Sequence, residues 1–351
     1  MRLALKEARK GMGLTSPNPP VGAVLVKDEV ELGRGHTQRV GGNHAEREAL
    51  ARALEGALEG ANDVPSIHGS TMYVTLEPCS SEGRTGACVT ALIEAGVSRV
   101  VYGTHDPNPL HQGRADEILK EAGIEVEWGL FQDECEKLIR GFAMVQREGR
   151  PWVIAKTAMS LDGRITRPEG EGQWLTGGEA RERVQILRGE VDAILTSGET
   201  LRRDDPALTI RSAEVSDLKE PVLRVVVTRQ EIERENYQMF KDEGGERSLI
   251  FRDVKLYEIL RTLAREKGVN VVLLEAGGDL LGAFADEGLI DEWMIFLAPL
   301  VCGGPKVGLG GGGAENLGER LALKEIEVER VGDDLYARGV VEREELRPLM
   351  R

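Results

Sequence analysis

The chain has 351 residues, of which 41% are hydrophobic and 30% are charged, and its formal net charge is -15. This length favours two domains that each bury a core of their own, and the composition excludes a disordered chain. The acidic charge argues against nucleic acid as a partner, because proteins that neutralise phosphate backbones carry a basic face. A small basic pocket for an anionic ligand is still compatible with it.

The sequence gives no sign of membrane insertion or secretion. No apolar stretch approaches the roughly 18 residues that span a bilayer. The first residues, "MRLALKEARKGMG", lack the apolar block of a signal peptide. The four cysteines, at 79, 88, 135 and 302, are too few and too scattered for a disulfide framework. We therefore expect a cytoplasmic protein with no membrane contact.

Residues 1–147 alternate helical and extended patterns, which predicts a sheet covered by helices. Two strands are joined as a hairpin through Asp28 and Glu29, and Asn43 is suited to cap the helix that follows. The expected elements are a helix over 3–12, strands over 21–27 and 30–36, a helix over 44–54, a surface loop over 56–70, a strand over 71–76, a helix over 86–96, a strand over 99–104, a helix over 115–123, a strand over 124–129 and a helix over 132–146.

The stretch "REGRP" at 147–151 separates this domain from a second α/β domain over 151–345. In the second domain we expect strands over 152–160, 193–197, 223–228, 248–251, 270–276 and 293–301, and helices over 179–190, 256–266 and 279–287. The Gly-rich "GLGGGGAEN" at 308–316 is predicted as a mobile surface loop.

The first domain contains a predicted zinc site. His44 opens a helix, Cys79 follows a strand and Cys88 opens the next helix. Imidazole and thiolate are zinc ligands, and three protein ligands plus a water form a catalytic rather than a structural site. A lone histidine is usually a surface or cap residue, and two cysteines are usually small buried groups. The agreement of several positions is what favours zinc here.

Glu46 stands in the first helical turn after His44, where it can reach a site beyond the end of the helix. A carboxylate there can take a proton from an activated water and pass it to a leaving group, which is what hydrolytic deamination needs. The order H-x-E, then P-C, then C is similar to the zinc nucleobase deaminase pattern. Eight residues separate Cys79 from Cys88, where that pattern has a short gap.

The second domain contains no histidine, so its chemistry must use other groups. Gly277 and Gly278 would free backbone amides at a helix start for a phosphate, although such turns are common without any ligand. Lys156 lies inside an apolar strand and must find a partner or face a cleft, and we favour the cleft. Asp204 and Asp205, before a proline, are typical of a helix or turn boundary.

Nearly the whole chain resembles the bifunctional riboflavin biosynthesis deaminase/reductase family. In the first half the similarity is carried by "SPNPPVGAVLV", "HAE", "TLEPCS", "GRTGAC", "ALIEAGVSRVVYG" and "DPNP". In the second half it is carried by "KTAMSLDGRI", "QWLTG", "LRGEVDAILTSGETLRRDDPALTIR", "VVLLEAGGDLLGAF", "GLIDE" and "APLVCGG". The resemblance implies an N-terminal cytidine-deaminase-like three-layer domain and a C-terminal dihydrofolate-reductase-like domain.

The resemblance also implies two reactions. The first domain would remove an amino group from 2,5-diamino-6-(5-phosphoribosylamino)pyrimidin-4-one, with Zn²⁺ as cofactor. The second would use NADPH to reduce the ribosyl side chain to ribityl. The implied partners are this small phosphorylated pyrimidine and, through the reductase domain, further copies of the chain in a homo-oligomer.

Functional positions follow from the resemblance residue by residue. His44, Cys79 and Cys88 would hold zinc, Glu46 would shuttle the proton, Asn18 would contact the base and Arg84 the substrate phosphate. In the reductase domain Lys156 and Asp204 would act at the reacting carbon. The positions implied on the NADPH side are Lys156, Trp174, Thr200, Asp204, Thr228, Gly277, Gly278, Asp279, Leu280, Leu281, Gly282 and Ala283. Those implied on the substrate side are Arg188, Leu208, Arg211 and Glu275.

Several positions depart from the family pattern. Ser81 stands where the family has a histidine after "EPCS", and Thr37 replaces another, with His36 shifted by one place. Both changes thin the polar lining of the deaminase pocket.

The loop between the two thiols also differs from the family. Gly86 and Ala87 replace two prolines, which loosens this loop, and Gly172 stands where the family has a substrate-contacting serine.

Three alternatives remain open at this point. A tRNA or free-base deaminase would keep the zinc site, but the acidic charge and the second-half motifs argue against it. A dihydrofolate reductase proper would leave the zinc site unexplained. The first half could instead be a zinc-binding scaffold beside an active reductase, a reading that ammonia release would test.

Overall fold

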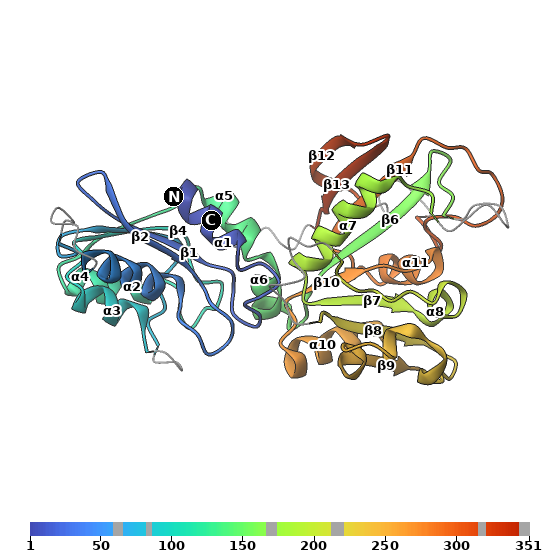
Figure 1. Ribbon diagram of the computed structural model, residues 1–351, viewed down its shortest axis with the longest axis horizontal. Helices are drawn as coiled ribbons and strands as arrows, with labels where there is room; N and C mark the ends of the chain where they lie inside the picture. Colours follow the sequence, from blue (N-terminus) through green and yellow to red (C-terminus); the bar gives the residue numbers. More distant parts are fainter. Residues whose placement is uncertain (59–65, 82–85, 166–173, 212–220, 315–320, 344–351) are drawn as a thin grey trace. The chain divides into compact units, whose positions relative to one another are not determined.

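The computed structural model describes residues 1–351 except six stretches, 59–65, 82–85, 166–173, 212–220, 315–320 and 344–351. The chain forms two compact units, Met1–Gly149 and Arg150 onward, each with its own sheet and helices (Figure 1). The division falls inside the "REGRP" stretch. Among the described residues, no helix combines the length and the apolar character that crossing a bilayer requires.

The first unit is a three-layer α/β/α domain. Its elements are α1 (Arg2–Arg9), β1 (Gly22–Lys27), β2 (Val30–His36), α2 (Ala45–Leu58), β3 (Thr71–Leu76), α3 (Cys88–Glu94), β4 (Arg99–Thr104), α4 (Arg114–Glu121), β5 (Glu125–Trp128), α5 (Gln132–Leu138) and α6 (Arg140–Glu148). The sheet order is β2-β1-β3-β4-β5, antiparallel on the β2 side and parallel from β3 to β5. Helices α1 and α5 cover one face, and α2, α3 and α4 cover the other (Figure 1).

Glycines in the hairpin strands let the helices lie close to the sheet. A Cβ on Gly22 of β1 would lie 1.9 Å from the carbonyl oxygen of Ala4, so α1 rests directly on this strand. A Cβ on Gly35 of β2 would lie 2.3 Å from Glu48 Cβ, and so α2 rests directly on the other face. This contact sets the height of the N-terminus of α2 above the sheet.

Most predicted elements of the first unit are present, with three differences, of which one is that α2 continues to Leu58, into the residues 56–70 predicted as a surface loop. The Asp28–Glu29 hairpin forms as expected, with positive φ at both residues. Helix α2 begins one residue later than predicted, so that His44 rather than Asn43 occupies the position before it, while the Asn43 side chain donates to Glu48 Oε1. The helix predicted over 132–146 is two helices, because the backbone at Ile139 leaves the helical conformation.

The second unit is a mostly parallel sheet flanked by helices. Its helices and strands are β6 (Trp152–Ser160), α7 (Gly178–Glu190), β7 (Ala193–Ser197), α8 (Gly198–Asp204), β8 (Leu223–Thr228), β9 (Ser248–Arg252), α10 (Leu256–Lys267), β10 (Val271–Leu274), α11 (Gly278–Asp286), β11 (Glu292–Ala298), β12 (Leu323–Val331) and β13 (Asp334–Val341). Three short 3-10 turns, Arg234–Asn236, Gln238–Phe240 and Gly245–Arg247, lie between β8 and β9.

The sheet order of this unit is β12-β13-β11-β6-β10-β7-β8-β9. The strands from β11 to β9 run parallel, and only β13 and β12 pair antiparallel. Apart from the half-buried edge strand β9, the parallel strands are mostly buried and apolar, as expected for strands covered on both faces, and they form the core with α10 and α11. Because parallel strands end at the same edge, their C-terminal loops meet on one side of the sheet.

Three features of the second unit were not predicted. The short helix α8 follows β7 directly, and β12 and β13 extend the sheet beyond residue 301. The described part of the Gly-rich stretch is not simply a mobile surface loop. Gly308 is buried, and the Gly310 N–H donates to Gly278 O at the start of α11. Exposed glycines occur only further along this stretch, over 311–313.

Candidate active sites

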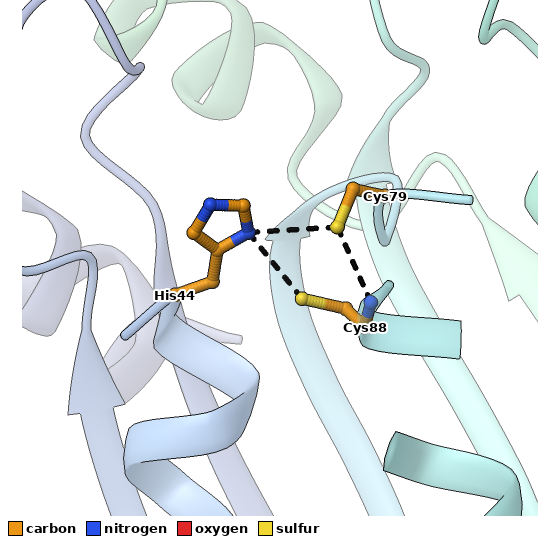
Figure 2. A group of neighbouring side chains, drawn as sticks. All are labelled: His44, Cys79 and Cys88. Carbon is orange, nitrogen blue, oxygen red and sulfur yellow. Dashed lines mark hydrogen bonds between the residues drawn. The ribbon is translucent and has the colours of Figure 1, made fainter. Parts of the chain in front are cut away.

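The three predicted zinc ligands converge in the first unit. His44 immediately precedes α2, Cys88 is the first residue of α3, and Cys79 lies in the loop after β3. Figure 2 shows the imidazole facing both sulfurs. His44 Nδ1 lies 3.5 Å from Cys79 Sγ and 3.4 Å from Cys88 Sγ, and all three ligand atoms lie within 4.8 Å of one another.

These distances fit a tetrahedral zinc ion. With Zn–N near 2.05 Å and Zn–S near 2.3 Å, a tetrahedral angle places nitrogen and sulfur about 3.6 Å apart. The two N–S distances are close to that value. The ligand set contains one imidazole and two thiols, which leaves a fourth position for water, as in catalytic sites.

The electrostatics of the two thiols also suit a cation. Hydrogen bonds from the Cys88 thiol, from His44 and from the Cys88 backbone N–H lower the pKa of Cys79 to about 4, although burial opposes this. The same contact with Cys79, together with burial, raises the pKa of Cys88 well above its ordinary value. Two adjacent sulfurs can both be thiolates only when a positive ion lies between them, and a divalent metal supplies that charge.

Glu46 is buried in the first turn of α2, with 3% of its surface exposed. Burial, helped by the charge of Cys79, raises the pKa of its carboxyl to about 7. The carboxyl also contacts the Cys88 thiol. A carboxyl with this pKa exchanges protons easily near neutrality, which suits a general acid and base.

The remaining deaminase-side residues lie in different surroundings. Asn18 closes a turn with Thr15 in the loop between α1 and β1, and its described contacts do not join it to the zinc ligands. Ser81 is exposed, and Thr37 is buried with its N–H bonded to Val21 O. Arg84 and Gly172 lie outside the described residues.

His36 does not take the place of a histidine at position 37. Its imidazole lies 3.5 Å from Glu7 Oε2 of α1, on the face of the sheet that α1 covers. Neighbouring strand residues face opposite sides, so a shift of one place moves a side chain across the sheet. Position 36 therefore faces away from α2.

A cleft of about 1840 Å³ lies in the second unit. It lies along the C-terminal ends of the parallel strands and the starts of α7, α8 and α11. All the described reductase residues predicted as site residues line it except Leu281 and Gly282. Leu281 is fully buried in the core, and Gly282 packs against the Gly310 backbone. Nine Lys or Arg and seven Asp or Glu line the cleft, so it is a basic pocket in an acidic chain.

Lys156 faces this cleft, as predicted, and it also has a partner. Arg188 holds Glu275 through both carboxylate oxygens, at 2.7 and 3.1 Å, and Lys156 Nζ lies 3.8 Å from Glu275 Oε2. Burial alone would raise the pKa of Glu275, but Arg188 and Lys156 outweigh it and lower that pKa. Burial lowers the pKa of Lys156, which Glu275 partly opposes.

The starts of α8 and α11 are joined beside the cleft. The Ser197 hydroxyl caps α8 through the Thr200 N–H at 3.0 Å, and the Gly277 N–H donates to Thr200 Oγ1 at 3.3 Å. A Cβ on Gly278 would lie 2.4 Å from Val307 O, so glycine lets two backbones approach here. These contacts fix the Gly-rich turn that is predicted to receive a phosphate.

Asp204 and Asp205 separate at the end of α8. Asp204 is its last residue and lines the cleft, and burial raises the pKa of its carboxyl. Asp205 adopts a left-handed conformation and accepts from the Gln238 N–H. Trp174 is half exposed at the cleft, with the Arg181 guanidinium 5.5 Å from its ring centroid.

The room and the charge of the cleft fit NADPH together with an anionic substrate. Ligand pockets for a single small molecule occupy about 300–1,000 Å³, and this cleft is larger. Its cationic side chains suit phosphate groups, and its Gly-rich turn allows a close approach of backbone amides.

Comparisons with known proteins cover both units. The family model for the cytidine and deoxycytidylate deaminase zinc-binding region matches residues 1–104, and the model for the RibD C-terminal domain matches residues 151–337. The riboflavin biosynthesis protein RibD of Escherichia coli K12 is 38% identical, over 95% of this chain and 96% of the relative. The chain belongs to the RibD family.

Solved RibD structures have the same fold over the whole length. RibD of Acinetobacter baumannii superposes with a TM-score of 0.86 at 34% identity, covering 97% of this chain and 98% of its own. The Thermotoga maritima diaminohydroxyphosphoribosylaminopyrimidine deaminase/5-amino-6-(5-phosphoribosylamino)uracil reductase gives 0.84 at 30% identity, covering 97% of each chain. The predicted combination of a cytidine-deaminase-like domain with a reductase domain is confirmed.

Family membership decides between the readings left open by the sequence. The chain is a bifunctional deaminase and reductase of riboflavin biosynthesis, because both domains of RibD are present. Its cofactors are zinc in the deaminase domain and NADPH in the reductase domain.

Sequence reasoning missed Glu77 and Asp106, which lie just after the neighbouring strands β3 and β4 at the edge of the sheet from which the Cys79 loop leaves. Both stand in motifs that were recognised, "TLEPCS" and "DPNP", but neither was assigned a role. The Asp106 carboxyl lies within electrostatic reach of Cys79.

Proposed function

We propose that the first unit, over residues 1–147, removes the 2-amino group of 2,5-diamino-6-(5-phosphoribosylamino)pyrimidin-4-one. The second, over 151–345, then reduces the ribosyl side chain of the product to ribityl. The observation that carries the proposal is the convergence of His44, Cys79 and Cys88, with Glu46 buried beside them. The order follows from the name of the Thermotoga maritima relative, whose reductase acts on a uracil, the deaminated form of the ring.

In the deaminase unit Glu46 moves the proton. Zinc, held by His44, Cys79 and Cys88, supplies the Lewis acidity that activates a water at neutral pH. Glu46 accepts a proton from that water as the water oxygen attacks C2 of the pyrimidine. Glu46 then gives the proton to the amino nitrogen, the C–N bond breaks and ammonia leaves. A pKa of about 7 lets this one carboxyl act in both directions.

Substrate contacts in this unit are assigned to Asn18, for the base, and to Arg84, for the phosphate. The phosphate assignment suits the chemistry, because a guanidinium binds a phosphate through two hydrogen bonds. Asn18 lies in the loop that precedes β1, and its carboxamide can both donate to and accept from a base.

In the reductase unit Lys156 and Asp204 are the polar groups assigned to the reacting carbon. NADPH, when bound, supplies the hydride that C1 of the ribosyl group receives. The ring oxygen gains a proton as its bond to C1 breaks, and Asp204 and Lys156, which both line the cleft, are the groups we assign to steer that proton. Burial raises the pKa of the Asp204 carboxyl, while the charge of Arg203 lowers it.

The other cleft residues are assigned to two sides. Arg188, Leu208, Arg211 and Glu275 would meet the substrate, and the Gly-rich turn with Trp174, Thr200 and Thr228 would meet NADPH. Because Leu281 and Gly282 do not line the cleft, their contribution would be to hold this turn in place.

Ammonia release tests the deaminase. Zinc-loaded protein without NADPH is expected to release ammonia from the diaminopyrimidinone, and Glu46→Ala is expected to lose most of this activity, by about 10²–10⁴-fold. The zinc content of the same variant should be normal, which shows that the first unit is folded, and its reduction of the deaminated compound should be normal, which shows the same for the second unit. Absence of ammonia from wild-type protein whose reductase is intact would mean that the first unit is a scaffold.

NADPH oxidation with the deaminated substrate tests the reductase assignment. Asp204→Asn is expected to lower turnover at least about 10²-fold, as for other proton-transfer groups. Asp205→Asn is the matched control, because this neighbouring acid bonds to Gln238 rather than lining the cleft. Full turnover in Asp204→Asn would remove Asp204 from the mechanism.

A cytoplasmic location remains a prediction from the sequence pattern, and a homo-oligomer assembled through the reductase unit remains a prediction from the family resemblance. Sedimentation of the purified full chain over a range of concentrations would test the second of these.

A further inference from the structure

The Glu77 carboxylate belongs to the same short stretch of chain as the zinc ligand Cys79 and has no role in the mechanism above. It follows β3 directly and stands two residues before Cys79. Only 1% of its side chain is exposed. A buried carboxylate requires hydrogen-bond donors, so its partners indicate what it holds.

All the described hydrogen-bond partners of this carboxylate belong to one stretch of chain. Oε2 accepts from the backbone N–H groups of Asp106, at 3.2 Å, and Gly113, at 3.1 Å. Oε1 accepts from the Ala115 N–H at 3.2 Å. His105 Nδ1 lies 3.1 Å from Oε2. Glu77 therefore fixes both ends of the segment 105–113 between β4 and α4.

This segment leaves the sheet on the same side as the loop that carries Cys79. Strands β3 and β4 are parallel neighbours, with Leu76 paired to Thr104, so the loops that follow them leave the same edge of the sheet. The first loop carries Cys79 and the second is the segment 105–113. In α/β sheets ligands bind at such an edge.

The charges of this segment agree with that placement. Burial raises the pKa of the Asp106 carboxyl, and the charges of Glu77 and Cys79 raise it further, while His111 opposes them. Asp106 also accepts from the Asn108 N–H at 2.8 Å, which tightens the turn. The segment 105–113 carries the polar residues Asp106, Asn108 and His111 and is called the polar wall below; Asp106 is the member whose carboxyl interacts electrostatically with Cys79.

We propose that Glu77 is a positioning residue for deamination, which holds the polar wall 105–113 at the distance that the pyrimidine ring requires from the zinc ligands. The inference rests on the proposed function, in which this unit binds a pyrimidine. Glu77 touches neither substrate nor metal, and it acts through the three backbone N–H groups. Its removal should therefore weaken substrate binding more than it slows the chemical step.

Glu77→Gln tests the proposal in the full-length zinc-loaded chain. A carboxamide has one acceptor oxygen and a donor NH₂, so it cannot serve donors on both sides, and the wall should shift. We expect KM for the diaminopyrimidinone to rise about tenfold with kcat changed less than about threefold. Amide hydrogen exchange over 105–115 should become faster. The zinc content and the reductase turnover should equal those of the wild type.

Glu77→Asp distinguishes the effect of side-chain length from the effect of the negative charge. It keeps the negative charge near the zinc ligands but is one methylene shorter, so it should behave like Glu77→Gln. Asp116→Asn is the matched control. This substitution removes a nearby negative charge. The Tyr102 hydroxyl donates to Asp116 Oδ1, and it can donate to the asparagine oxygen in the same way, so KM should be unchanged.

Four outcomes are decisive. A normal KM in folded Glu77→Gln, or in Glu77→Asp alone, would overturn the proposal, as would loss of zinc from Glu77→Gln. Slower deamination with unchanged exchange over 105–115 would also overturn it. If wild-type protein releases no ammonia, the proposed function fails, and hydrogen exchange still shows whether Glu77 holds the wall.

Discussion

Arg188 and Glu275 form a buried pair of charges in the reductase cleft. Their side chains are 10% and 11% exposed. The pair lowers the pKa of Glu275 relative to the unfolded chain, despite burial. A group with a lowered folded pKa contributes stability that is present above its unfolded pKa of about 4.3 and is lost as the pH falls through the folded pKa.

Arg188→Met is expected to destabilise the second unit by about 3–5 kcal/mol near neutral pH, because it leaves a buried carboxylate with only Lys156 as a partner. The pKa of Glu275 should rise, so that the acid loss of stability begins at a higher pH than in the wild type. Urea unfolding between about pH 4 and pH 8 measures both effects.

The control for this prediction is Arg183→Met on the same helix. Arg183 is 44% exposed and pairs with Glu329 at 3.4 Å on the surface, where an ion pair contributes about 0–1 kcal/mol. Equal losses in the two variants would mean that burial of the Arg188 pair adds nothing.

For single residues, the sequence predicts a role where the side chain itself carries the chemistry, as in a metal ligand. His44, Cys79 and Cys88 were predicted because their types and spacing suit zinc. The function of Glu77 was not predictable in this way. Its partners are backbone N–H groups from 29 to 38 positions further along the chain, and backbone groups have no sequence signature.

Among the secondary-structure elements, β2 and α2 matter most to the zinc site. The N-terminus of α2 presents His44 and Glu46, and its height is set by the glycines of β2. Both glycines face this helix. Gly33 packs against Ala49 and Ala53, and Gly35 packs against Glu48 and Ala49.

Gly35→Ala is expected to lift the N-terminus of α2, since the new Cβ would lie 2.3 Å from Glu48 Cβ and 2.8 Å from Ala49 N. Overpacking of this kind costs about 1–3 kcal/mol. A displacement of about 1 Å at the site can cost 10²-fold in rate. Zinc affinity, measured by competition with a chromogenic chelator, and ammonia release should therefore both fall.

Gly56→Ala provides the matched control on α2. A Cβ at Gly56 meets nothing within 4 Å, so alanine should stabilise the helix by about 0.5–1 kcal/mol and leave zinc affinity unchanged. The interpretation would be wrong if Gly35→Ala bound zinc as tightly as this variant does.

Sequence patterns predicted the buried strands well and the terminal hairpin not at all. Strands such as β7 and β8 are short apolar runs with sharp limits, and they were placed correctly. Most of β12 is exposed and charged, so no alternation of buried and exposed residues marks it. The break between α5 and α6 was also missed, because the apolar spacing continues through Ile139.

At the scale of the whole molecule, the second unit begins with a buried ion pair. Arg150 donates to both oxygens of Asp291, at 2.7 and 2.9 Å, and each side chain is 1% exposed. The Val153 N–H donates to the same carboxylate. The start of β6 is thereby tied to the start of β11.

Arg150→Met is expected to lower the stability of the second unit by up to about 3–5 kcal/mol, because the buried Asp291 loses its two-pronged partner and keeps only Arg343, 3.0 Å away, among the described cationic side chains. Differential scanning calorimetry of the full chain measures this as a lower transition temperature for the unit that NADPH stabilises. The transition that zinc stabilises should not move. A shift of both transitions by the same amount would mean that the two units unfold together.

Removal of zinc should affect the first unit alone. Chelation should abolish ammonia release and lower only the transition of the first unit, since a metal that binds the folded state stabilises it by mass action. Reductase turnover with the deaminated substrate should persist, because none of the described cleft residues is a zinc ligand. Loss of both activities on chelation would contradict independent units.

The sheet of the second unit ends at β12, whose outer backbone groups pair with no further strand in the described chain. An open edge of this kind is a template for aggregation through strand pairing. This edge is interrupted by a bulge between Lys324 and Glu327, with Glu325 at a φ of 52°. Charged side chains follow along the strand. Copies of the chain crowded together at high concentration are therefore protected from joining edge to edge into fibres at this strand.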